Sequence, residues 1–365
     1  MQINDIFNNK EDVKQILAAI HAEASPNRTY RIMEVCGTHT MSIARHGLPS
    51  LLPSNVKLVS GPGCPVCVTS QADIDNCIDL SDHRDVTITT FGDMLRVMGT
   101  DRKSLYSAKA EGADVRIIYS PLDTIAMAKA NPDRKHIFIA VGFETTAPMA
   151  AGLVKMAHAE GLNNISILSM CKTMPQAFHL LLTDDTAAID GFLCPGNVSV
   201  VTGLSIYEPI VKANKAAVVA GFEPMDILSS VLEIIRQVNS GNFSVMNNYL
   251  RACKAEGNLK AQALINEIFI PADSRWRGLG VLPNSGLAVR DEYAIHDAAK
   301  VFNLDPNREE RPTACKCGDI LKGKILPKDC PLFATKCTPE SAVGPCMVSS
   351  EGACAAHYKY SLRNS

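Results

Sequence analysis

The chain has 365 residues, of which 46% are hydrophobic and 20% charged, and its formal net charge is −2. This length suffices for two or three domains, while the near-neutral charge gives no reason to expect nucleic acid or an anionic membrane as a partner. No apolar run reaches the ~20 residues that span a bilayer, and the first residues do not resemble a secretory signal, so we expect a cytoplasmic protein.

Short runs of β-branched and aliphatic residues alternate with helical patterns through the first 220 residues. This alternation predicts βαβ units and parallel sheets. We expect two sheets, divided near Asn131-Pro132-Asp133, because this turn-forming cluster interrupts the pattern near its midpoint. The expected strands are residues 31–35, 56–60, 86–90, 115–119, 136–141, 165–168, 189–193 and 217–220.

Cys36 ends the first expected strand, in the run Cys36-Gly37-Thr38-His39-Thr40. Gly37 permits a tight turn, and the threonines are candidate caps for a short helix. Cys36 and His39 are three residues apart and could face one site, where thiolate and imidazole together suit iron, zinc or copper. The alternative is an ordinary buried cysteine.

A Cys-x-x-Cys motif follows the second expected strand, in Gly61-Pro62-Gly63-Cys64-Pro65-Val66-Cys67. A helical pattern then begins, and the positive end of a helix favours thiolate over thiol. Cys64 and Cys67 are therefore candidates for a redox or metal-transfer pair. Half of a structural zinc site is the alternative, but the chain has no second Cys-x-x-Cys.

A third loop, Gly142-Phe143-Glu144-Thr145-Thr146, follows the strand at 136–141. The carboxyl ends of parallel strands meet at one edge of a sheet, where ligands bind. Glu144 is therefore a candidate base or ligand, although a solvated surface charge is equally compatible with the sequence. The loop after 189–193, which contains Pro195-Gly196-Asn197-Val198-Ser199, occupies the corresponding position.

The pattern changes after residue 223. Residues 225–238, 244–255 and 259–269 are expected helices, and regular periodicity fades from Ile270 onward. We therefore expect an α/β protein with two parallel-sheet domains and a cleft, plus a third, mainly helical or irregular, Cys-rich domain. The expected parts are residues 1–45 (an N-terminal helix and the Cys36 turn, which could pack on the third domain), 46–130, 131–223 and 224–365.

Six of the 13 cysteines lie in the last 51 residues, from Cys315 to the end. Four of them, at 330, 337, 346 and 354, are separated by six, eight and seven residues. Four thiolates match one [4Fe–4S] cluster, whereas structural zinc usually uses tighter pairs. Zinc, free thiols and disulfides remain alternatives. Cys315 and Cys317 could supply other ligands, form a dithiol beside the cluster, or simply lie in a loop.

Cys77 and Cys253 fall in helical patterns and are interpreted as core residues, while Cys171 is left without a role. Trp276 is the only tryptophan. Packing under a loop is the simpler interpretation for it, and a contact surface is the alternative.

In this order, the motifs resemble the HypD family of hydrogenase maturation proteins. The resemblance rests on the loops of Cys36, Cys64 and Glu144, and it spans nearly the whole chain. It continues through Pro195-Gly196-Asn197-Val198-Ser199, Trp276-Arg277-Gly278-Leu279-Gly280 and the closing Cys-rich stretch. Two positions depart from the family pattern, because Met41 and Asn197 stand where a histidine is often found.

The resemblance implies a redox-active scaffold that assembles the Fe(CN)2CO group of [NiFe]-hydrogenases. It also implies a complex with the small chaperone HypC and a cyanide donor, HypE. By position, Cys36 would hold the iron together with a HypC cysteine, and Cys64 and Cys67 would form the dithiol. The ligands of a [4Fe–4S] cluster would be Cys330, Cys337, Cys346 and Cys354.

Two other classes of function compete with the scaffold. One is a free-standing iron–sulfur thiol/disulfide oxidoreductase, and the other is a zinc-stabilised interaction module. Nucleic-acid binding is disfavoured because no dense basic stripe is interleaved with aromatic residues.

Overall fold

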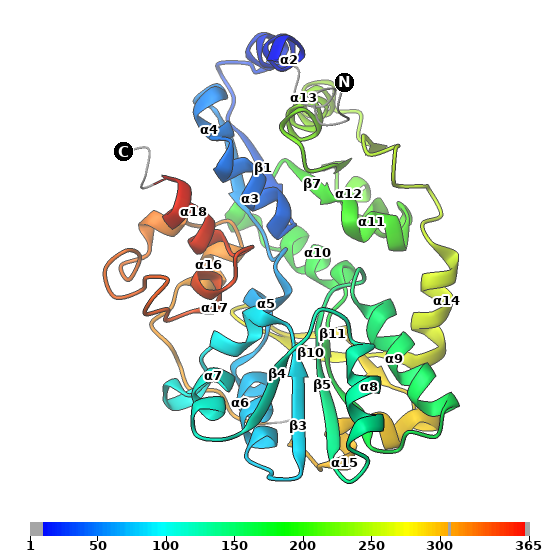
Figure 1. Ribbon diagram of the computed structural model, residues 1–365. Helices are drawn as coiled ribbons and strands as arrows, with labels where there is room; N and C mark the ends of the chain where they lie inside the picture. Colours follow the sequence, from blue (N-terminus) through cyan, green and yellow to red (C-terminus); the bar gives the residue numbers. More distant parts are fainter. Residues whose placement is uncertain (1–9, 306–307, 362–365) are drawn as a thin grey trace.

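The computed structural model describes residues 10–305 and 308–361 (Figure 1). It contains two parallel sheets, a two-stranded antiparallel hairpin and a C-terminal segment of short helices. The architecture is therefore α/β with two parallel sheets, as predicted.

The first sheet has the strand order β2-β1-β7-β8-β9, and all its strands are parallel. Side chains alternate between its two faces, so neighbours such as Ile32 and Met33 enter different cores. The helices α2 and α13 pack together over one face, with apolar α13 side chains such as Ile227 and Ile234 against it. The strands are β1 (Tyr30–Glu34), β2 (Val56–Ser60), β7 (Gly191–Pro195), β8 (Ala216–Ala220) and β9 (Val245–Asn247).

The helices connected with the first sheet come from two separate parts of the chain, before and after the second sheet. They are α2 (Lys10–Glu23), α3 (Gly37–Arg45), α4 (Leu48–Leu51), α10 (Met174–Thr183), α11 (Gly196–Thr202), α12 (Glu208–Lys212) and α13 (Pro224–Ser240). Phe178 of α10 and Tyr207, just before α12, pack edge to face, and both are fully buried.

The second sheet has the order β4-β3-β5-β6 and is also parallel. Figure 1 shows it below the first sheet, with the short helix α5 between the two. Its strands are β3 (Val86–Thr90), β4 (Asp114–Ile117), β5 (Lys135–Gly142) and β6 (Ile165–Cys171). Its associated helices are α5 (Pro65–Val68), α6 (Gln71–Ser81), α7 (Leu105–Ala110), α8 (Asp123–Ala130) and α9 (Ala147–Ala159).

The expected division of strands between the sheets is wrong. β3 and β5 lie on opposite sides of Asn131-Pro132-Asp133 in the sequence, yet they pair with each other. The chain leaves the first sheet after β2, builds the whole second sheet, and returns to the first sheet at β7. The Asn131 cluster is only the turn between α8 and β5. Local turn signals cannot reveal this path, because strand pairing is set by contacts between distant residues.

Two further segments differ from expectation. The helix expected at residues 244–255 is not formed, because β9 pairs with the edge of the first sheet there and turns follow it. Pairing with β8 therefore overrides the local helical pattern. The expected irregular stretch after Ile270 begins with a hairpin of β10 (Phe269–Trp276) and β11 (Gly280–Val289). The helix expected at 259–269 is confirmed as α14 (Leu259–Ile268).

The C-terminal segment consists of short helices linked by turns. They are α15 (Ala298–Val301), α16 (Cys317–Leu321), α17 (Pro345–Val348) and α18 (Ala353–Ser361). In Figure 1 the last helix, α18, lies beside α3, on which it packs. α17 likewise contacts α5. The Cys36 turn therefore lies against the Cys-rich segment, whereas the N-terminal helix α2 packs on α13 instead.

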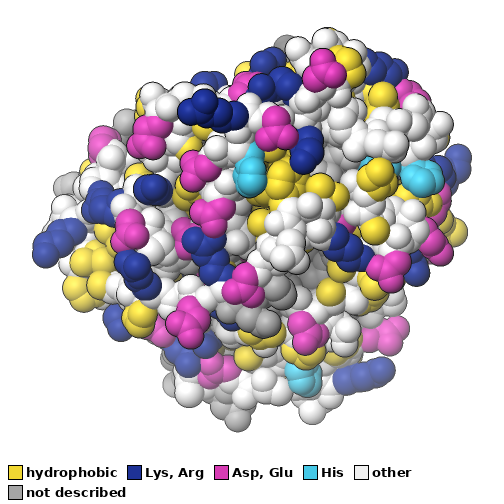
Figure 2. Space-filling model, turned by 90° about the horizontal axis from the view of Figure 1, so that it is seen from below, with side chains coloured by type: hydrophobic (Ala, Val, Ile, Leu, Met, Phe, Trp, Pro, Cys, Tyr) yellow, Lys and Arg dark blue, Asp and Glu magenta, His cyan; other side chains and the backbone are white. Residues whose placement is uncertain are grey.

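Acidic and basic side chains are interspersed on the face shown in Figure 2. None of the described helices combines the length and the apolar character that a membrane span requires. The expected cytoplasmic location stays a prediction.

Candidate redox and metal centre

The loops after β1 and β2 lie side by side, because Glu34 and Ser60 are partners in the parallel pair. The Gly61 N–H donates to the Glu34 carbonyl (2.7 Å), and the Gly37 N–H donates to the Gly63 carbonyl (3.0 Å). A Cβ atom on Gly63 would lie 2.2 Å from the Cys36 nitrogen. Only glycine allows this approach, which brings the Cys36 and Cys64 loops into backbone contact.

Cys36 occupies the N-cap position of α3 and is 7% exposed. Burial raises the pKa of its thiol to about 12, and the nearby Glu351 carboxyl adds to the effect. The backbone N–H groups of Thr38 and His39 and the Thr38 hydroxyl act in the opposite direction. A bound cation would remove the cost of the buried thiolate, so this environment suits a metal ligand better than a free nucleophile.

Cys64 and Cys67 are joined by a disulfide, with 5.2 Å between their Cα atoms. Proline at the start of α5 fixes the turn, and the Cys67 N–H points at the Cys64 sulfur (3.2 Å). Cys64 is 4% exposed and Cys67 is fully buried. α5 contacts β5 of the second sheet and α17 of the C-terminal segment. The pair therefore lies where the two sheets and the Cys-rich segment meet.

The His39 ring faces the loop that follows β8. Its Nε2 atom lies 2.8 Å from the Gly221 carbonyl, and the ring packs against Phe222 with 4.8 Å between centroids. Burial lowers the pKa of His39 to about 4, so the ring is neutral at pH 7. Its Nδ1 atom is buried without a hydrogen-bond partner. His39 is thus three residues from Cys36 in the sequence but is directed toward another loop of the same sheet edge.

Glu144 is buried (6% exposed) rather than solvated at the surface. Its Oε1 atom accepts a hydrogen bond from the N–H of Met174, the first residue of α10 (2.8 Å), while Oε2 has no partner. Burial raises the pKa of Glu144 to about 7, against the effect of the Met174 N–H. A carboxyl that is half satisfied and titrates near neutrality can hold and release a proton.

The six C-terminal cysteines line one small cavity, together with Ile320, Leu332, Phe333 and Met347. Gly344 leaves room for this arrangement, because a Cβ atom there would lie 2.5 Å from the Cys315 sulfur. Burial and the neighbouring thiols raise the pKa values of Cys346 and Cys354. The cysteines that line the cavity are Cys315, Cys317, Cys330, Cys337, Cys346 and Cys354.

This donor set fits an iron–sulfur cluster, because it consists of thiols within an apolar wall. The thiols repel one another as thiolates and need cationic iron to be deprotonated together. Across residues 10–305 and 308–361, no three histidine, cysteine, aspartate or glutamate side chains are placed to hold a single metal ion.

Sequence reasoning missed three charged residues, two of which lie beside the candidate cysteines. Glu351 lies over Gly37, where a Cβ atom would be 2.4 Å from the Glu351 Cβ, and it accepts from the Thr38 hydroxyl (2.9 Å). The backbone N–H of Arg277 donates to the Val68 carbonyl (2.8 Å). The positive charge of its side chain acts to lower the pKa values of Cys315 and Cys346, against the effect of burial.

The third missed residue is Lys172, which is 1% exposed. Its Nζ donates to the Ser274 hydroxyl (2.9 Å) and the Arg275 carbonyl (3.0 Å), and lies 3.8 Å from Asp73. Burial lowers its pKa. Only their positions in the sequence could have indicated a role for these residues. Lys172 directly follows a buried strand, and Glu351 lies between Cys346 and Cys354.

Trp276 packs under a loop, as the simpler interpretation predicts. It is 1% exposed, stacks on Phe143 (5.8 Å between centroids) and donates to the Ser285 hydroxyl (2.8 Å). The interpretation of Cys77 and Cys253 as core residues is confirmed, since both are buried. Cys171 is buried at the end of β6.

Comparison with a family model and with individual known proteins points to one family. The model of the HypD family, described as the hydrogenase formation hypA family, matches residues 11–361. The hydrogenase maturation factor HypD of Azotobacter vinelandii is 45% identical over 99% of this chain and 97% of its own length. The Escherichia coli K12 protein of the same name is 42% identical over the full length of both chains. A putative hydrogenase expression/formation protein of Methanocaldococcus jannaschii is 44% identical over 97% of this chain and 98% of its own.

Proposed function

The chain belongs to the HypD family of hydrogenase maturation factors, and from this premise we propose that it is a redox-active scaffold for assembling the Fe(CN)2CO group of a [NiFe]-hydrogenase. One observation carries the proposal: the Cys36 loop and the Cys64 loop are in backbone contact. The Cys-rich segment packs against both of them, through α18 on α3 and α17 on α5.

Cys36 would hold the iron, which is cargo rather than a resident cofactor. Thiolate is a suitable anchor for iron, and the buried position excludes water from it. A small HypC-type chaperone would share the iron through its own cysteine, and a HypE-type partner would supply cyanide. These two partners follow from the family resemblance.

Cys64 and Cys67 would store electrons beside the iron. Opening their disulfide takes two electrons and two protons and gives two thiols. Glu144 and His39 would handle protons at this edge of the sheets, since each has one buried polar atom without a partner. Glu144 is the better proton holder at neutral pH, because His39 binds a proton only in acid.

Cys330, Cys337, Cys346 and Cys354 would hold a [4Fe–4S] cluster, which supplies single electrons when bound. Ile320, Phe333 and Met347 would keep water away from it. Arg277 would offset the negative charge of the thiolates. Cys315 and Cys317 line the same cavity and exceed the four ligands that a cube requires.

The burial of Cys64 and Cys67 favours the scaffold over a free-standing thiol/disulfide oxidoreductase. A thiol substrate must reach a sulfur atom to exchange with it, and access here is poor. Multiple turnover of a thiol substrate by the isolated chain with a reductant would instead support the oxidoreductase. Acid-labile sulfide would exclude the zinc-stabilised module.

The proposal is tested by Cys36→Ala, in protein purified without oxygen after expression with the partner proteins. We expect the infrared bands of iron-bound cyanide and carbonyl to disappear while the visible absorbance of the cluster remains. Cys77→Ala, a change at a buried cysteine in α6, is the matched control and should keep both signals. Retention of the bands in Cys36→Ala would refute the assignment, and loss of both signals would show that Cys36 acts through folding.

A further inference from the structure

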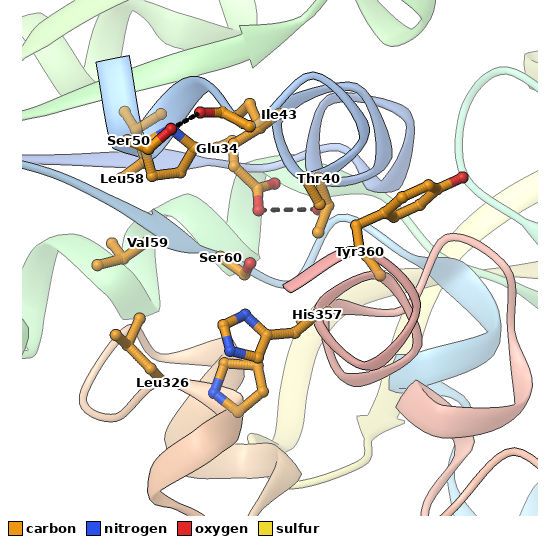
Figure 3. A pocket seen from close by; sticks show the side chains of 16 residues that line it. Glu34, Thr40, Ile43, Ser50, Leu58, Val59, Ser60, Leu326, His357 and Tyr360 are labelled. Carbon is orange, nitrogen blue, oxygen red and sulfur yellow. Dashed lines mark hydrogen bonds between the residues drawn. The ribbon is translucent and has the colours of Figure 1, made fainter. Parts of the chain in front are cut away.

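A second pocket lies between α3, β2 and α18 (Figure 3). Its volume is about 340 Å³, within the range of small-molecule sites. Most of its wall is apolar, and the described residues that line it include no lysine or arginine. The apolar lining comes from Ile43, Ala44, Leu58, Val59, Leu326 and Ala353.

Glu34, the last residue of β1, places its carboxyl group in this pocket. The side chain is only 2% exposed. Its Oε1 atom accepts a hydrogen bond from the Thr40 hydroxyl (2.8 Å), whereas Oε2 is buried and makes no hydrogen bond of ordinary length. Burial raises the pKa of Glu34 to about 8, against the effects of the nearby Ser60 and Thr40 hydroxyls and the Cys36 backbone. Figure 3 shows the carboxyl directed into the space between Thr40 and Ser60. A buried acceptor without a donor costs free energy, so the carboxyl of Glu34 leaves one unmet polar requirement in this pocket. The other polar side chains that line it are Thr40, Ser50, Ser60, His357 and Tyr360.

We infer that this pocket binds a small organic ammonium compound with an apolar body, whose N–H group donates to Glu34 Oε2. A hydrogen bond to a charged group is worth more than a neutral one, and the effect is strongest where water is excluded. The apolar body fits the wall formed by α3, β2 and α18.

The pocket is coupled to Cys36 through one hydroxyl group. Thr40 Oγ1 donates to Glu34 Oε1 and also lies 3.3 Å from the Cys36 carbonyl. Ala353, on the opposite wall, directly precedes Cys354 of the cysteine cavity. An occupant would therefore contact the helix that follows Cys36 and the helix that contains Cys354.

The experiment titrates the full-length protein with butylammonium, cyclohexylammonium and benzylammonium, by calorimetry and ligand-detected NMR. Benzyl alcohol is the neutral probe matched to benzylammonium. We expect at least one ammonium compound to bind saturably, and its neutral match to bind about tenfold to a hundredfold more weakly. Glu34→Gln, which keeps the oxygen that accepts from Thr40, should weaken ammonium binding by a similar factor.

Ala44→Leu fills the pocket from α3 and should abolish binding. Ala126→Leu, at an exposed position in α8, is the matched control and should bind like the wild type. The inference is overturned if none of the ammonium compounds binds, if benzyl alcohol binds as tightly as benzylammonium, or if Ala44→Leu leaves binding unchanged. None of these outcomes depends on iron or on hydrogenase maturation, so they leave the proposed function unaffected.

Discussion

Replacing Glu144 with glutamine should stabilise the protein in a pH-dependent way. The folded carboxyl has a pKa of about 7 because it is buried, against 4.5 for an exposed glutamate. The raised pKa means that the folded state holds the proton more tightly, so the ionised carboxyl destabilises the fold. At 1.36 kcal/mol per pKa unit, this cost is at most about 3.4 kcal/mol.

The two pKa values determine how the stability difference between Glu144→Gln and the wild type changes with pH. Below pH 4.5 the carboxyl is protonated in both states and the substitution should change little. The advantage of Glu144→Gln should grow between pH 4.5 and 7 and be complete above pH 7. The entropy of unfolding is about 2.1 cal/mol/K per residue, so a stability gain of about 3.4 kcal/mol should raise Tm by about 4 °C for the whole chain. The glutamine oxygen can still accept from the Met174 N–H.

The assay is calorimetric Tm measurement of both proteins from pH 4.5 to 8.5, without oxygen. Glu256→Gln, at an exposed position, is the control and should show no such pH dependence. If Glu144→Gln were equally stable at pH 8, or less stable at every pH, burial of the charge would not be the dominant effect at this site.

Three further outcomes are expected. Gly63→Ala should lower Tm by several degrees and reduce bound iron, because its Cβ would lie 2.2 Å from the Cys36 nitrogen; Gly92→Ala, with nothing within 4 Å, should change neither. Trp276→Phe leaves the Ser285 hydroxyl without its donor and should cost about 1–3 kcal/mol, measured by urea unfolding, with no loss implying a replacement partner. Removing iron with a chelator should speed tryptic cleavage in the C-terminal segment but not in the two sheets, and equal cleavage would refute ordering by a cluster.

The sequence revealed every strand of the two parallel sheets except β9, because buried parallel strands are short apolar runs between turns. It could not reveal which strands pair, so the division near Asn131 was wrong. The segment at 244–255 has a local helical pattern, but β9 forms there because β8 offers an open edge. Such pairing depends on residues far away in the sequence.

The sequence identified some residues of the candidate site and missed others. Cys36, Cys64 and Glu144 were identifiable because they follow strands of parallel sheets, whose carboxyl ends carry sites. Lys172 and Glu351 were missed because a lone charge has no diagnostic pattern until its burial is known. The direction of the His39 ring depends on Gly221, a residue 182 positions away.

The interrupted path of the chain through the first sheet has a consequence for folding. Ile32 of β1 pairs opposite Gly191 of β7, so that pairing waits until the ribosome has made the whole second sheet. Closing so long a loop carries a large entropic cost, which slows assembly. Until then β1 has an unpaired edge, and the Cys36 loop that follows β1 lacks part of its final surroundings. Oxidants and stray metal ions would therefore reach Cys36 more easily in the nascent chain than in the folded protein.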